Sequence, residues 1–402
     1  RTADSDVAGP DADGLALQVS CRTWVPEDRG RVGAGRACDC EPSGNGAGAD
    51  LVQGTLHHGH VGVDLFFFIS GYIIAYPFLA GHAPALGRFF GRRVLRIEPP
   101  YFLVMIGCFL ALALSGYKPD NAPSFGRTDA PLWQSLAASM GYVHGVVFNA
   151  PPRLNPPAWS LEVEVQFYLI APLVMIALNR IRSRPTRRGG ILCAAIVALI
   201  GSSAILGRDP HSLFQWTLIC HAWPFLLGIL ICDYAAESSP IQKETHIGFD
   251  IALMIALIGM AISGHFEERV HGLWQYMARD GARAVCILAI YYGAFRGVVG
   301  RRVTGEPWVA LIGGACYSIY LTHVPLMQAM SEIVFKFLHP SSLLEAWLLA
   351  FGVLIPASIA AGLIFYALIE RPCTIPDWPR RALAALSRFS GKRRIAPNRS
   401  QA

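Results

Sequence analysis

Long apolar runs recur along most of the chain and restrict what it can fold into. From residue 61 onward nine of them follow one another, at 61–80, 99–115, 159–178, 190–206, 213–232, 249–264, 282–295, 308–337 and 344–369. A helix needs roughly 20 apolar residues to cross the hydrocarbon core of a bilayer. Hydrophobic residues make up 53% of the chain and charged residues only 15%, a balance that excludes an ordinary soluble globular protein. The sequence therefore predicts an all-α, polytopic membrane helix bundle.

The distribution of arginine predicts the side of the membrane on which each loop lies. Arginine is concentrated at 88–96, 180–188 and 296–302 and in the C-terminal tail. Loops rich in Lys and Arg stay in the cytoplasm, so the loops at 116–158, 207–211, 265–280 and 338–343 are expected on the outer side. The mostly acidic loop 233–248 falls in the cytoplasm by parity alone. This alternation leaves residues 1–60 outside, and one additional upstream span would place both termini in the cytoplasm.

Residues 1–55 differ in composition from the rest of the chain. They are rich in Gly, Ala, Asp and Arg, contain no Lys, and show no helical or strand periodicity. Such a segment is predicted to be disordered. We therefore expect three parts: a non-membrane segment 1–55, a membrane domain 56–372, and a basic cytoplasmic tail 373–402.

The segment 159–173, WSLEVEVQFYLIAPL, carries two carboxylates in an apolar helix. A carboxylate inside a membrane is costly unless it is paired, hydrated or protonated. Glu162 lies in the first turn, where nearby water and the helix dipole favour an anion. Ser160, Glu164 and Tyr168 recur every four residues and form one polar stripe. Glu164 is thus either the partner of a buried arginine or a functional residue.

An arginine cluster precedes the second apolar run. Arg92, Arg93 and Arg96 lie just before residues 97–100 at the expected cytoplasmic boundary, and Arg93 and Arg96 share a face of a helix. The cluster either anchors the helix by the positive-inside rule or binds an anionic group, such as the phosphates of a nucleotide-containing donor.

His323 lies near the middle of the run 308–337, two residues before Pro325. Proline removes a helical hydrogen bond, so a kink beside His323 is expected. The histidine is either a cavity residue or a hydrogen-bonded packing residue. The cluster at 57–60, HHGH, has poor spacing for a zinc site, and the scattered cysteines form no CxxC pair, so no metal site is expected.

Four stretches together resemble the integral-membrane acyltransferase-3 family of bacterial carbohydrate O-acetylases. They are GHVGVDLFFFISGYII (59–74), RRVLRIEPPYF (92–102), PPAWSLEVEVQFYLIAPL (156–173) and CYSIYLTHVPL (316–326). The resemblance implies a ten-helix bundle in the bacterial inner membrane. It also implies transfer of an acyl group, usually acetyl, from cytoplasmic acyl-CoA as co-substrate to a carbohydrate hydroxyl. No bound cofactor and no nucleic-acid partner are implied.

The resemblance also assigns roles to individual residues. Arg93 and Arg96 match the pair thought to bind the acyl-CoA phosphates, and Glu164 and His323 match the family's Glu and His. The expected substrate cavity contains five further residues, Asp64, Ser70, Trp159, Ser160 and Tyr320.

The chain departs from the family at its N-terminal end. The family carries its main catalytic His on a first span, which is absent here and replaced by residues 1–55. We expect a frameshift or truncation there, with His57 or His58 as a displaced remnant of that His. Two other functions stay open: a transporter or flippase, and a catalytically impaired relative. The lack of a repeated half with paired broken helices speaks against many transporter folds.

Overall fold

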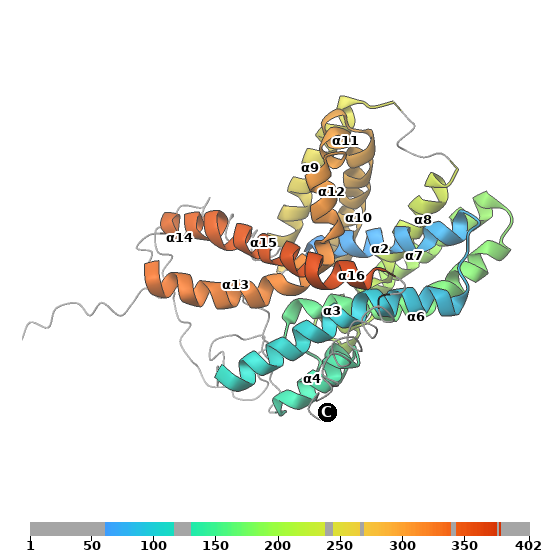
Figure 1. The fold of residues 1–402 in the computed structure, drawn as a ribbon. Helices are drawn as coiled ribbons and strands as arrows, with labels where there is room; N and C mark the ends of the chain where they lie inside the picture. Colours follow the sequence, from blue (N-terminus) through green and yellow to red (C-terminus); the bar gives the residue numbers. More distant parts are fainter. Residues whose placement is uncertain are drawn as a thin grey trace, which may run out of the picture.

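The computed structural model describes residues 61–115, 130–237, 244–265, 269–338, 343–375 and 378. Our predictions for residues 1–55, for His57 and His58 and for most of the C-terminal tail fall outside these ranges. Within them all regular structure is helical and no strand occurs, which confirms the all-α prediction. The helices form a bundle from which α13–α15 extend to one side and α9–α12 to another (Figure 1).

Seven helices are long and apolar enough to cross a membrane, or up to nine if each of two bent pairs is one span. The longer helices are α2 (Gly62–Leu79), α3 (Leu86–Ser115), α6 (Trp159–Arg180), α7 (Arg184–Arg208), α8 (Leu218–Ala235), α9 (Ile247–His265), α10 (Leu273–Arg296) and α13 (Cys316–Leu338). The last span combines α14 (Leu343–Leu349), α15 (Ile355–Phe365) and α16 (Arg371–Cys373) with π-helical segments at Ala350–Leu354 and Tyr366–Glu370. The predicted polytopic membrane architecture is confirmed.

Two of the predicted spans are broken. Helix α10 turns by 79° into α11 (Val298–Thr304), and α12 (Pro307–Gly314) turns by 67° into α13. At the first bend Asp250 accepts the backbone N–H groups of Val298, Val299 and Gly300 at 2.7–3.1 Å, so a carboxylate satisfies the free start of α11. At the second, the break lies at Ala315, and Pro325 lies inside the continuous helix α13.

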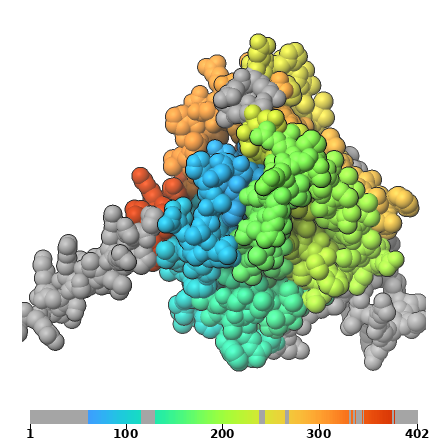
Figure 2. Space-filling model, turned by 90° about the vertical axis from the view of Figure 1, so that its right-hand side faces the viewer, coloured from blue at the N-terminus to red at the C-terminus, as the bar shows by residue number. Residues whose placement is uncertain are grey.

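The central helices are packed closely through glycine. Helix α2 packs along α8, and α8 packs against α7; Figure 2 shows the blue segment of α2 and the start of α3 beside the green α7. A Cβ at Gly71 would lie 2.2 Å from the carbonyl oxygen of Phe225, and one at Gly228 would lie 2.0 Å from that of Phe68. Small residues let membrane helices approach backbone to backbone, and here α2 and α8 do so reciprocally.

The segment before α6 folds over one end of the bundle. It contains α4 (Leu132–Met140) and α5 (His144–Phe148). The buried His144 ring contacts Ser135 Oγ at 2.9 Å and the Ala150 carbonyl at 3.2 Å. Burial lowers the pKa of His144 to about 4, so this imidazole is neutral at physiological pH.

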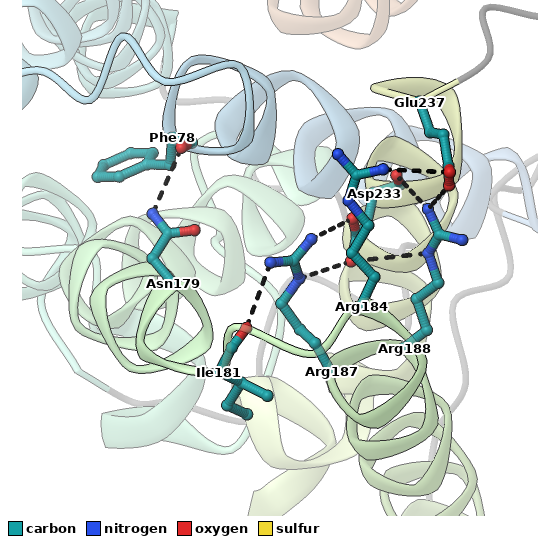
Figure 3. A network of polar contacts seen from close by, with 8 residues as sticks. All are labelled: Phe78, Asn179, Ile181, Arg184, Arg187, Arg188, Asp233 and Glu237. Carbon is teal, nitrogen blue, oxygen red and sulfur yellow. Dashed lines mark hydrogen bonds and ion pairs between the residues drawn. The ribbon is translucent and has the colours of Figure 1, made fainter.

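An ion-pair network joins α7 to the end of α8. Arg187 donates two hydrogen bonds to Asp233, at 2.6 and 2.7 Å, and Arg188 and Arg184 pair with Glu237 at 2.7 and 3.1 Å (Figure 3). Asp233 is only 2% exposed, whereas the Glu237 side chain is 49% exposed. The arginines of the basic segment 180–188 therefore hold helices together in addition to any role in orientation.

Asp233→Asn is expected to destabilise the bundle strongly. Removing one partner of a buried pair leaves the other charge uncompensated, at a cost of about 3 kcal/mol in the free energy of unfolding. The thermal midpoint of the detergent-solubilised protein measures this effect. Glu237→Gln is the matched control, because the exposed pairs of Glu237 contribute little; equal losses in the two variants would contradict this account.

Candidate active site

Glu164 is the centre of a polar cluster inside the bundle. It is 4% exposed, and its Oε1 accepts hydrogen bonds from Ser70 Oγ of α2 at 2.5 Å and from the Tyr168 hydroxyl one turn along α6. The predicted stripe is therefore confirmed for Glu164 and Tyr168. The sequence left two alternatives for Glu164, the partner of a buried arginine or a functional residue. Among the described residues Glu164 forms no ion pair with an arginine, and its partners are hydroxyl groups.

Arg93 of α3 lies against the ring of Tyr168. The Arg93 guanidinium lies 5.0 Å from the centre of the Tyr168 ring, a distance at which a cation is attracted to the ring face. Tyr168 is in contact with both Glu164 and Arg93 and joins them in one cluster.

A pocket of about 420 Å³ opens beside this cluster. Three arginines of α3 line it, together with residues at the end of the last span: Arg92, Arg93, Leu95, Arg96, Cys373 and Thr374. The segment 88–96 is helical and forms the first part of α3, which places Arg93 and Arg96 on one side. A pocket with several guanidinium groups suits a phosphate-bearing ligand.

Glu370 holds one of these arginines. It is fully buried and accepts a hydrogen bond from Ser318 Oγ of α13 at 2.6 Å and from Arg96 at 3.4 Å. The Arg96 side chain remains 45% exposed, so it can pair with Glu370 and still face the pocket.

Ser160, Tyr320 and His323 form a separate group. Ser160 Oγ lies 2.8 Å from the Tyr320 hydroxyl, which also donates to the carbonyl of Pro157. The His323 ring lies against Tyr320, and its Nδ1 is 2.6 Å from the Tyr320 carbonyl. Among the described residues no hydrogen bond joins His323 to Glu164.

Glu162 has a different role from the one we expected. It is 1% exposed rather than near water, and its oxygens accept the backbone N–H groups of His144 at 3.2 Å and Gly145 at 2.9 Å. The first turn of α6 is buried because the segment around α4 and α5 covers it. Glu162 thus fixes that segment in place, and its environment differs from that of Glu164.

A second polar cluster joins the first turns of α2 and α8 to the first half of α10. Asp64 in the first turn of α2 pairs with Arg283 of α10 at 3.4 Å, and Asp280 pairs with Arg279 at 2.8 Å. His221 in the first turn of α8 is half-buried, and the charges of Asp64 and Asp280 act on it electrostatically. We assigned Asp64 to the substrate cavity but missed its partners. The signal was the RDGAR segment at 279–283, because charges in an otherwise apolar helix indicate an interior polar contact.

Trp159 lies beside His221. Its ring is 5.1 Å from that of His221 and 6.3 Å from that of Phe67. His58 falls outside the described residues. Within them no group of three His, Cys, Asp or Glu side chains could hold a metal ion.

Comparisons with known proteins agree with the motifs. The acyltransferase-3 family model, described as an acyltransferase domain, matches residues 44–367. The membrane-bound transacylase BcsY of Komagataeibacter xylinus is 26% identical over 345 residues, covering 83% of this chain and 80% of that protein. The peptidoglycan O-acetyltransferase OatA of Listeria monocytogenes is 23% identical over 300 residues, and the O-acetyltransferase OatA of Staphylococcus aureus is 23% identical over 296 residues.

The chain corresponds to only part of the OatA relatives. The alignments include 69% and 68% of this chain but only 46% of each OatA protein, so the chain spans less than half the length of those two relatives. No solved structure shows significant similarity to it. The family match covers most of the chain and includes the buried Glu164 and the three arginines of the pocket. The chain therefore belongs to the acyltransferase-3 family and is a multi-pass membrane acyltransferase.

Proposed function

We propose that this protein transfers an acetyl group from acetyl-CoA to a hydroxyl group of a carbohydrate, as an O-acetyltransferase. The observation that carries the proposal is the arginine-lined pocket next to the Arg93, Tyr168, Glu164 and Ser70 cluster. A donor held by its phosphates in this pocket would bring its thioester toward the buried polar groups. The names of the OatA relatives support acetyl as the group and peptidoglycan-type carbohydrate as an acceptor class.

Acyl transfer requires a held donor, oriented polar groups and a base. Arg93 and Arg96 hold the donor phosphates, and Glu370 keeps Arg96 in place through an ion pair. Glu164 fixes the Ser70 and Tyr168 hydroxyls in one orientation beside the thioester. Because these groups are set before the donor arrives, they need no reorganisation during the reaction.

The proposed orientation follows the arginines. Arg93 and Arg187 both lie in the first third of their helices, which by the positive-inside rule begin in the cytoplasm. The donor pocket then opens toward cytoplasmic acetyl-CoA, and the starts of α2, α6, α8 and α10 face the outer side of the inner membrane, with the C-terminus in the cytoplasm. Ser160, Tyr320 and His323 lie at the start of α6 and in α13, where they would line the path of the acceptor.

Release of coenzyme A tests the proposal. Purified protein in lipid vesicles is given acetyl-CoA with and without a mixture of glucose and N-acetylglucosamine oligomers, and free thiol is measured. We expect acceptor-dependent release of coenzyme A. A transporter would instead move substrate without cleaving the thioester, so transport without release would refute the proposal.

Arg93→Ala is expected to raise the KM for acetyl-CoA at least about tenfold, because a charge-assisted phosphate contact contributes ~1.5–3 kcal/mol. The same substitution should have a smaller effect with 3′-dephospho-acetyl-CoA if Arg93 contacts that phosphate, and an equal effect if it contacts the pyrophosphate. Arg88→Ala is the matched control, since Arg88 lies on the same helix, is exposed and does not line the pocket. Equal KM values in all three proteins would refute the donor site.

A further inference from the structure

We propose that Asn155 is a positioning residue for the transfer reaction. Its side chain replaces the helical hydrogen bond that Pro325 removes from α13, and it thereby fixes Tyr320 and His323 beside Ser160. The inference rests on the proposed function, which places these three residues on the path of the acceptor. Asn155 lies one residue before the motif 156–173, and no spacing pattern in the sequence marks it.

The backbone of α13 lacks one hydrogen bond at Pro325. This proline lies inside the helix and has no N–H, so the carbonyl of Leu321, four residues earlier, has no helical donor at that position. Leu321 is 1% exposed and packs in an apolar cluster with Leu154 and Leu161. A buried carbonyl without a partner costs free energy. Inside a membrane bundle, a neighbouring segment has to supply the donor.

Asn155 supplies this donor from the segment before α6. Its Nδ2 donates a hydrogen bond to the Leu321 carbonyl at 2.8 Å, and the side chain is fully buried. In the part of the chain that the structure describes, its Oδ1 has no hydrogen-bond partner. A buried oxygen without a partner is itself unfavourable. The asparagine therefore serves the contact with Leu321 rather than the packing of this segment.

The same short segment makes a second hydrogen bond to α13. The Tyr320 hydroxyl donates to the Pro157 carbonyl at 2.8 Å and also lies 2.8 Å from Ser160 Oγ. Two adjacent residues of α13, Tyr320 and Leu321, are thus bound to Pro157 and Asn155. This turn of α13 is held to the start of α6 at two points.

His323 lies inside the turn that Asn155 closes. The missing helical hydrogen bond would join residues 325 and 321, with His323 between them. The Nδ1 atom of His323 is 2.6 Å from the Tyr320 carbonyl, and its ring lies against the Tyr320 ring. A helix bends most easily at a proline. Without Asn155, α13 can bend between Leu321 and Pro325, and His323 and Tyr320 then move relative to Ser160.

The donor pocket is connected to a different turn of α13. Ser318 donates to Glu370, which pairs with Arg96. Ser318 lies about one turn before Leu321, on the side away from Pro325. A bend between Leu321 and Pro325 therefore leaves this contact in place. We expect the loss of Asn155 to affect the transfer step more than the binding of acetyl-CoA.

A double-mutant cycle in the thermal midpoint, measured in detergent, tests the contact itself. Asn155→Ala should lower the midpoint by about 3 °C or more, because the buried Leu321 carbonyl loses its donor. Pro325→Ala gives residue 325 an N–H for that carbonyl, so in this background Asn155→Ala should lower the midpoint by less than about half as much. Equal shifts in the two backgrounds, or no shift by Asn155→Ala alone, would overturn the proposal.

The vesicle assay with acetyl-CoA and the oligosaccharide mixture tests the positioning role. For Asn155→Ala we expect kcat to fall at least about tenfold, with the KM for acetyl-CoA unchanged within about twofold. Adding Pro325→Ala should restore kcat at least about fivefold, because the helix then closes its own hydrogen bond. A residue that only packs would not be rescued in this way.

Asn179→Ala is the matched control. The Asn179 side chain makes the same kind of amide-to-carbonyl hydrogen bond, to Phe78 at 3.3 Å (Figure 3), but it is exposed and lies at the other end of α6. This variant should retain the wild-type kcat.

The outcomes separate this proposal from the proposed function. A kcat for Asn155→Ala within about twofold of wild type, or a loss that Pro325→Ala does not restore, would overturn the positioning role and leave the proposed function intact. Absence of coenzyme A release by the wild-type protein would overturn both.

Discussion

Glu164→Gln is expected to lower kcat for acetyl transfer by about 100-fold or more, which corresponds to ~2.7 kcal/mol of transition-state stabilisation. The carboxylate accepts hydrogen bonds from both Ser70 and Tyr168 at one oxygen. A carboxamide has no charge and presents N–H donors on one side, so the two hydroxyls lose a strong common acceptor. The KM for acetyl-CoA should change little, because the arginines that line the donor pocket are untouched.

Glu162→Gln provides the comparison on the same helix. Glu162 binds backbone N–H groups of α5, so its loss should lower the thermal midpoint while kcat of the folded protein stays within a few-fold of wild type. Activity of Glu164→Gln within threefold of wild type would refute a role of Glu164 in transfer. Equal losses of kcat in the two variants would show that any buried carboxylate on α6 has the same effect.

Gly228→Ala is expected to destabilise the protein by about 3 kcal/mol or more. The added Cβ would lie 2.0 Å from the Phe68 carbonyl oxygen and 2.8 Å from the Tyr72 nitrogen. Both contacts are to backbone atoms of α2, which cannot rotate away, so α2 and α8 must separate and lose packing. The same shift would displace Ser70, so both stability and transfer should fall.

Gly201→Ala is the matched substitution in a helix. A Cβ at Gly201 of α7 meets nothing within 4 Å, and alanine favours the helix over glycine by about 1 kcal/mol. In a thermal unfolding experiment in detergent, the midpoint should therefore fall for Gly228→Ala and rise for Gly201→Ala. A midpoint for Gly228→Ala at or above that of wild type would contradict the close approach of α2 and α8.

The sequence predicted the membrane architecture and part of the site for identifiable reasons. Apolar runs and arginine clusters are local signals, and so is the four-residue spacing of Glu164 and Tyr168, which are hydrogen-bonded in the structure. The pairing of Ser70 with Glu164 is long-range. From the sequence, Ser70 and Glu164 were both expected in the site only because each matches a motif of the same family. Nothing in the sequence indicated that the two residues are in contact.

Other features depend on neighbours that no local pattern reveals. Glu162 was expected to lie near water because the first turn of a membrane helix usually does. It is buried instead, because the segment around α5 covers it. A single polar residue such as His221 has no spacing to mark it, and only the packing of α2, α8 and α10 brings it near Asp64. The break at Ala315 follows two glycines, Gly313 and Gly314, which are a local signal that our sequence-based prediction did not use.

Acetyl-CoA labelled in its acetyl group tests the central claim most directly. The wild-type protein and an Arg93→Ala/Arg96→Ala variant are placed in sealed vesicles with the donor on the side of the arginine pocket, and label is measured as alkali-labile ester on the oligosaccharides. We predict labelled ester with the wild-type protein and a loss of at least about tenfold in the variant at low donor concentration. Label that stays in acetyl-CoA with the wild-type protein, or equal transfer by the two proteins, would contradict the account.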